Sequence, residues 1–153
     1  MAKMTARSRA GQKAGTKSLR DRSARWHAQL QRAGANFTAA ARYMSDGQVD
    51  VDALTREFAM TKAGLAKLVG LSEETLQRLS RLAAPKTQQR LRDMLEILTR
   101  VEPWAGGMAQ AMGWYRGQGI PALGDQTAEA LVRNDQADVV RAYLDGLAAG
   151  GYA

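Results

Sequence analysis

Residues 61–81 carry apolar, small and polar side chains in the order that two short helices joined by a tight turn require. Three apolar residues recur at helical spacing and would share one face of the first helix: Leu65, Leu68 and Val69. Gly70 follows at the point where the chain leaves that helix, because glycine adopts the left-handed conformation of such a turn at the lowest cost. Ser72 then stands at the N-cap of a second helix that extends to Arg81. This pattern is typical of a helix-turn-helix.

The second helix would direct its polar side chains away from a small core of three leucines, Leu71, Leu76 and Leu79. In DNA-binding proteins with this motif, the second helix lies in the major groove. We expect Gln77 and Arg78 to contact bases there, because both side chains can form paired hydrogen bonds with purine edges. The other expected DNA contacts, at the helix start and along the phosphates, are Ser72, Lys62, Arg81, Lys86 and Arg90.

Two observations argue for a different interpretation of this segment. Glu73 and Glu74 stand at the start of the second helix, where their carboxylates suit the helix dipole but repel phosphates. An ordinary helical hairpin that binds no DNA has the same apolar pattern. The sequence leaves this alternative open.

The positive charge of the chain lies in its first two thirds. Residues 1–50 hold ten Lys or Arg against three acids, residues 51–100 hold nine against six, and residues 101–153 hold three against six. A basic surface of this kind is expected of a protein that binds a polyanion such as DNA. The acidic last third predicts a second partner of different charge.

Composition divides the chain into three parts. Residues 1–20 are rich in Lys, Arg, Gly, Ser and Thr, so we predict a flexible basic arm. Such an arm can lie on phosphates, but a solubilising tail or an organelle transit peptide has a similar composition. Residues 21–100 are predicted as a helical region that contains the helix-turn-helix at 61–82, and residues 101–153 as a second small domain.

A long amphipathic helix is predicted over residues 88–100, with Thr87 as its cap. Its apolar stripe consists of Leu91, Met94, Leu95 and Leu98. We expect Pro103 to interrupt this helix and to open the next one, over residues 104–116.

Short polar residues mark the ends of the remaining elements. They stand where they can cap further helices: either Asp50 or Asp52 for the first, Thr127 for the next and Asp135 for the last. Asp46-Gly47 marks a turn, and residues 117–126 are predicted as a loop from their glycine and proline content. No segment is predicted as a strand, so the expected fold class is all-α.

The sequence offers no set of residues for catalysis. His27 is the single histidine and cysteine is absent, so neither a His-rich metal site nor a thiol nucleophile can form. The glycine-rich pattern that holds phosphates in nucleotide-binding enzymes is also missing. We therefore expect no enzyme activity, no metal and no cofactor. No apolar run approaches the about 20 residues that span a bilayer, and the lack of cysteine fits the reducing cytoplasm, where we expect the protein to act.

Residues 101–153 resemble the toxin-binding domain of Xre/MbcA/ParS-type antitoxins. That domain has an aromatic residue and glycine after a long helix, and a tryptophan in the next helix. A loop follows with proline or asparagine before an Ala-Leu-Gly core, and then a Thr- or Ser-capped helix with an acid and a leucine. A last amphipathic helix and a terminus like Gly-x-Tyr-Ala close the pattern. The matching residues here are Trp104, Gly106, Gly107, Trp114, Pro121, Ala122, Leu123, Gly124, Thr127, Glu129, Leu131, Gly150, Gly151, Tyr152 and Ala153. The resemblance covers about residues 50–153. Asp125 departs from it where a second glycine is frequent, and Ala128 where a proline often opens the helix.

The resemblance implies an all-α type II antitoxin with an N-terminal helix-turn-helix region and a small helical toxin-binding domain. In that family the partner is a RES-domain toxin, which consumes NAD or transfers ADP-ribose from it. The antitoxin blocks the NAD cleft of the toxin and binds operator DNA to repress its own operon. A homodimer is expected as well. The alternative is a stand-alone transcriptional regulator with a helix-turn-helix, whose C-terminal helices serve only to form a dimer.

The resemblance also implies where the toxin binds. We expect one toxin-facing surface made of Trp114, Tyr115, Ile120, Pro121, Leu123, Gly150, Gly151, Tyr152 and Ala153. Two glycines allow the terminus to extend, and Tyr152 offers an aromatic anchor. The terminal carboxylate is an anion that can replace a phosphate of NAD. The alternatives are that the loop packs on Trp114 as part of the core and that the terminus is a frayed tail.

Overall fold

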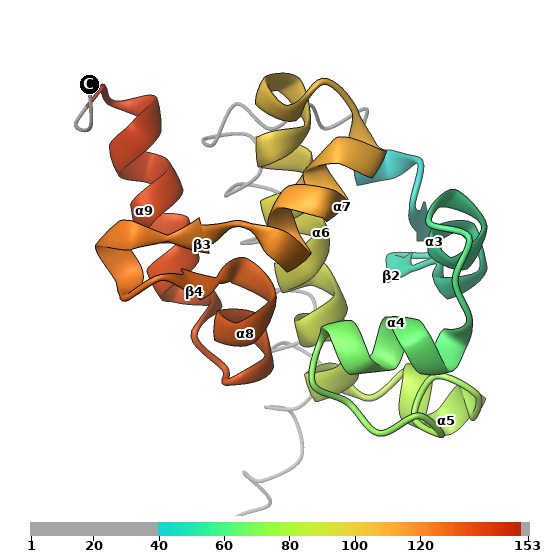
Figure 1. The fold of residues 1–153 in the computed structure, drawn as a ribbon. Helices are drawn as coiled ribbons and strands as arrows, with labels where there is room; N and C mark the ends of the chain where they lie inside the picture. Colours follow the sequence, from blue (N-terminus) through green and yellow to red (C-terminus); the bar gives the residue numbers. More distant parts are fainter. Residues whose placement is uncertain (1–39, 151–153) are drawn as a thin grey trace, which may run out of the picture.

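The computed structural model describes residues 40–150 (Figure 1), which form seven α-helices and two antiparallel hairpins. In chain order the elements are β1 (Met44–Ser45), β2 (Gln48–Val49), α3 (Val51–Glu57), α4 (Lys62–Leu68), α5 (Leu79–Leu82), α6 (Pro85–Ala105), α7 (Met108–Gly117), β3 (Gly119–Ile120), the 3-10 turn η1 (Pro121–Leu123), β4 (Gln126–Thr127), α8 (Ala128–Arg133) and α9 (Ala137–Ala148). The described part of the chain is mostly helical, as predicted. The predicted arm over residues 1–20 and the expected toxin contacts Gly151, Tyr152 and Ala153 lie outside it.

Helix α6 is the central element of the fold. Figure 1 shows it passing through the middle of the molecule, with α3 and α4 on one side and α8 and α9 on the other. Its predicted apolar stripe is confirmed, because four of its side chains are completely buried: Leu91, Met94, Leu95 and Leu98. Burial of one such side chain contributes about 1.5–3 kcal/mol, so α6 supplies much of the apolar core.

The core is continuous over the described residues. Leu65 and Val69 belong to the same cluster of buried side chains as Leu131 of α8 and Leu144 of α9. Residue 100, where the sequence predicts a change of domain, lies inside α6. The helix-turn-helix region and the C-terminal helices therefore share one core.

The long helix ends later than predicted. Pro103 does not interrupt it, and α6 continues to Ala105 before it stops at Gly106 and Gly107, which have φ angles of 92° and 142°. The amides of both glycines donate to the carbonyl of Glu102, at 3.1 and 3.2 Å. A proline costs a helix one hydrogen bond, whereas a positive φ ends it, and glycine adopts that conformation at little cost.

Two of the predicted helix caps are confirmed. The Asp50 carboxylate accepts a hydrogen bond from the amide of Ala53 at 2.9 Å and so caps α3. The Thr127 hydroxyl accepts one from the amide of Ala130 at 3.1 Å and so caps α8. Each side chain pairs one of the amides that a helix start leaves without a partner.

Two other predicted caps are wrong. Thr87 is buried inside α6, because Pro85 opens that helix and is favoured in its first turn. Asp135 has a φ of 63° and lies before Gln136, the N-cap of α9. The Asp135 carboxylate is instead 3.4 Å from Nε of Arg90.

The two hairpins were not predicted. Asp46 and Gly47 form the predicted turn, and their φ angles of 51° and 75° are those of a type I′ turn, which joins β1 to β2. β3 pairs with β4, with Gly119 opposite Thr127. Each strand has only two residues, which is too short to show the alternation that identifies strands in a sequence.

Candidate functional site

The turn after α4 is built as the sequence predicts. Gly70 has a φ of 71°, and the amide of Leu71 donates to the carbonyl of Ala66 at 2.9 Å. A Cβ at Gly70 would lie 2.9 Å from the carbonyl oxygen of Arg133 in α8. Both the backbone conformation and the close approach of α8 therefore require glycine.

The second helix of the motif is not continuous, which corrects the prediction for residues 72–81. The chain forms successive turns over residues 73–77, and Arg78 is extended, with φ −107° and ψ 120°. Only α5 is helical. The Ser72 hydroxyl lies 2.6 Å from the Thr75 hydroxyl, so it pairs with a side chain where a backbone amide was expected.

The break at Arg78 changes the direction of the next side chain. Leu76 is buried, as predicted, but Leu79 is 84% exposed and does not close the core. In a continuous helix these two leucines, three residues apart, would share a face. The extended residue between them turns Leu79 outward.

Of the seven expected base and phosphate contacts, Lys62 is half-buried and Arg90 is treated below. The other five are exposed: Ser72, Gln77, Arg78, Arg81 and Lys86. The Glu74 carboxylate lies 3.9 Å from a guanidinium nitrogen of both Arg78 and Arg81. Lys62 is 3.2 Å from Asp52. Exposed ion pairs contribute about 0–1 kcal/mol, so these cations can exchange a carboxylate for a phosphate at small cost.

Arg90 is the exception, because its guanidinium is buried inside the protein. Its Nη1 donates to the carbonyls of Val69, Val132 and Arg133 at 3.1, 2.9 and 3.1 Å. Only 8% of the residue is exposed. The prediction that Arg90 contacts phosphate is therefore wrong. Its side chain joins the end of α4 to the end of α8.

Two of the expected toxin contacts are also inside the core. The Tyr115 hydroxyl donates to the carbonyl of Leu68 at 3.2 Å, and burial raises the pKa of this hydroxyl. Ile120 is 1% exposed. Neither side chain can contact a partner in this structure, because both are buried.

The loop between β3 and β4 exposes the other expected contacts. Pro121, Ala122 and Gly124 are exposed, whereas Leu123 is half-buried against the core, as is Trp114. Gly119 fits closely here, since a Cβ on it would lie 2.8 Å from the carbonyl oxygen of Asp125. Gly150, at the end of the described residues, is exposed. In Figure 1 this loop and the end of α9 lie on the side of α6 opposite α3.

A buried ion cluster holds α9 against α6, and the sequence did not predict it. Arg141 of α9 pairs with Asp93 of α6, and its Nε is 2.9 Å from the Glu96 carboxylate. Burial raises the pKa of both carboxyl groups, and Arg141 offsets the rise only in part. Burial opposes the charge of Arg141, but Glu96 and Asp93 outweigh it and raise the pKa of the guanidinium. Asp93 and Glu96 are three residues apart in α6, and this spacing alone does not tell whether they face the solvent or another helix.

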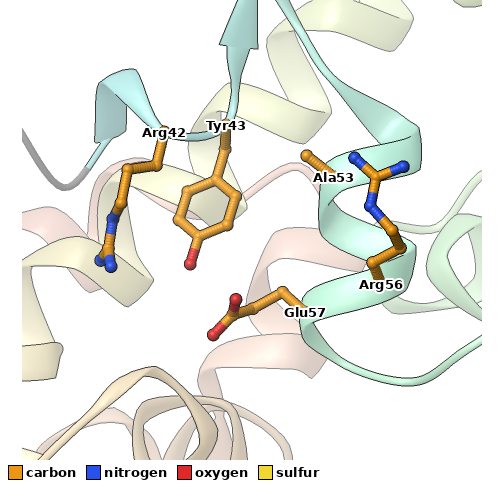
Figure 2. A pocket seen from close by; sticks show the side chains of 5 residues that line it. All are labelled: Arg42, Tyr43, Ala53, Arg56 and Glu57. Atoms are coloured by element: carbon orange, nitrogen blue, oxygen red, sulfur yellow. The ribbon is translucent and has the colours of Figure 1, made fainter.

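A polar pocket of about 360 Å³ lies between the start of β1 and α3 (Figure 2). It is lined by Arg42, Tyr43, Ala53, Arg56 and Glu57. The Tyr43 hydroxyl points toward the Glu57 carboxylate. Burial raises the pKa of this hydroxyl, and the charge of Glu57 adds to the rise. Arg42 is 3.3 Å from Glu102 and lies over the Tyr43 ring. No motif in the sequence predicted this pocket.

None of the helices that the structure describes is long and apolar enough to cross a bilayer. Residues 40–150 contain no group of three side chains that could hold a metal ion. Comparisons with family models, with curated proteins and with solved structures gave no match to this chain. The fold thus defines a mostly helical protein with a single core, which supports both the α4–turn–α5 segment and the exposed loop between β3 and β4.

Proposed function

We propose that this chain is a cytoplasmic type II antitoxin, which neutralises a RES-domain toxin and binds operator DNA. One observation carries the proposal. The loop that holds the most specific part of the resemblance, residues 120–127, is anchored at both ends and exposed at its tip. Ile120 is buried and Thr127 caps α8, whereas Pro121, Ala122 and Gly124 face the solvent.

An anchored loop suits a binding role. Its backbone is already ordered before a partner arrives, so association costs less conformational entropy. The Asp125 carboxylate is exposed at the tip. An acidic tip favours a cationic cleft, such as one that accepts the phosphates of NAD.

The α4–turn–α5 segment supports the DNA-binding part of the proposal. Its exposed cations, Arg78, Arg81 and Lys86, follow one another over nine residues, and Gln77 lies beside them. Arg and Gln can read base edges in the major groove. The break at Arg78 means that this segment does not present one straight helix to the groove.

Binding to DNA should depend on Arg78 and be opposed by Glu74. We expect Arg78→Ala to weaken binding by about 1–3 kcal/mol and to relax sequence preference. Glu74→Gln should strengthen binding, because it removes a carboxylate from between two arginines. A mobility-shift assay on the wild-type chain and both variants measures these effects. If Arg78→Ala binds as tightly as the wild type, this segment is not the reading surface.

Toxin neutralisation should depend on the loop. Ala122→Arg places a like charge at the proposed contact, and we expect it to weaken inhibition of a RES-type toxin by about 2 kcal/mol or more, roughly thirtyfold. Ala83→Arg is the matched control, since Ala83 is exposed beside α5. Growth rescue at matched expression measures the effect. Full rescue by Ala122→Arg, or equal loss in both variants, contradicts the assignment of the loop.

A further inference from the structure

Leu79 is the most exposed large apolar side chain among the described residues, at 84%. A leucine that stays in water forgoes the free energy that burial of its side chain would contribute. The exposure results from the extended conformation of Arg78, which ends the preceding turns and starts α5. The backbone therefore holds this leucine outward.

The surroundings of Leu79 are polar and basic. Arg78 and Ser80 flank it in the chain, and Gln77 and Arg81 are exposed nearby. A protein interface would need a larger apolar area than one side chain offers. The cations favour an anionic partner, and a DNA groove combines phosphates with small apolar groups.

Thymine supplies such an apolar group. Its C5-methyl projects into the major groove, and aliphatic side chains recognise it by van der Waals contact. Arginine and glutamine beside Leu79 can pair with neighbouring purines in the same groove. These chemistries complement each other over adjacent base pairs.

We propose that Leu79 is a specificity-determining residue, which contacts the methyl group of a thymine in the major groove. This inference rests on the proposed DNA-binding function. It assigns a thymine to the site, next to the bases that Gln77 and Arg78 contact.

The experiment removes the proposed contact in two ways, first by deleting the methyl group from the DNA and then by shortening the Leu79 side chain. A 30-bp duplex is first enriched by the full-length wild-type chain from a random pool, and each thymine in it is then replaced by uracil, which lacks only the methyl group. At one position we expect uracil to weaken wild-type binding about three- to fivefold. This factor corresponds to the free energy of burying one apolar carbon. Leu79→Ala should weaken binding to the thymine duplex by a similar factor and be insensitive to uracil at that position.

Two controls keep the result specific. Leu79→Met retains an apolar side chain and should preserve the sensitivity to uracil. Val139→Ala removes an exposed apolar side chain from α9 and should leave DNA binding unchanged. Leu79→Ala should also unfold at the wild-type temperature, because the side chain is not in the core.

Different failures have different meanings. If the wild type enriches no sequence, the DNA-binding proposal fails and this inference with it. If it enriches a duplex but no uracil position affects it, or Leu79→Ala stays sensitive to uracil, only the role of Leu79 is overturned. If Leu79→Ala changes the oligomeric state and not DNA binding, the leucine contacts a second copy of the chain, which also overturns the inference.

Discussion

Replacing Arg141 by methionine is expected to lower the free energy of unfolding by about 3–5 kcal/mol, because it removes the cation that pairs with two buried carboxylates. Asp93 and Glu96 are 6% and 1% exposed, and Arg141 pairs with both. Urea unfolding followed by circular dichroism measures the change. Arg116→Met is the matched control, since Arg116 is exposed and 3.7 Å from Glu129. We expect the control to change stability by less than about 0.5 kcal/mol.

The same variant should have a distinct pH dependence. Burial already raises the pKa of Asp93 and Glu96, and Arg141 holds that rise in check. Without Arg141, the pKa of each carboxyl in the folded state moves further above its unfolded value of about 4. The folded variant then binds more protons than the unfolded chain, so its stability should increase as pH falls from 7 to 5. An equal deficit against the wild type at both pH values contradicts this role of Arg141.

Replacing Arg90 by methionine is expected to cost about 2–4 kcal/mol, because three carbonyls lose a charged donor at once. These carbonyls belong to Val69, Val132 and Arg133, so the variant should loosen the contact between α4 and α8. Thermal unfolding of the full-length chain measures the loss. Hydrogen exchange should show the effect at both helix ends.

Lys86→Met separates this structural role from contact with phosphate. Lys86 is exposed at the start of α6, so its loss should weaken DNA binding and leave stability unchanged. Arg90→Met should do the reverse when DNA binding is measured at a temperature where the variant is folded. Unchanged stability together with a shallower salt dependence of DNA binding would restore the original prediction for Arg90.

Local signals in the sequence predicted the features that depend on few neighbouring residues. The stripe of α6 follows from helical spacing alone, and the turn at Gly70 from the properties of glycine. Asp50 and Thr127 cap their helices because each needs only an amide three residues later. Such signals need no knowledge of the fold, but they do not suffice everywhere, because the caps predicted at Ser72, Thr87 and Asp135 are not formed.

Several of the errors arose where long-range packing decides. Arg90 and Tyr115 have side chains that suit a surface as well as a core. Only packing brings them to the carbonyls to which they donate, those of Val132 for Arg90 and Leu68 for Tyr115. No glycine or proline near Arg78 indicates in the sequence that the helix is interrupted there. For the loop, the sequence predicted the exposed tip at Pro121 but not the buried anchor beside it.

The most direct test measures the rate at which a RES-type toxin consumes NAD in the presence of this chain. The purified full-length chain is titrated into the toxin, and NAD is measured over time. We expect the rate to fall to background once the chain reaches the stoichiometry of the complex, and Ala122→Arg to leave most of the activity at the same ratio. An unchanged rate of NAD loss in excess of the folded wild-type chain would contradict the proposal that it is an antitoxin.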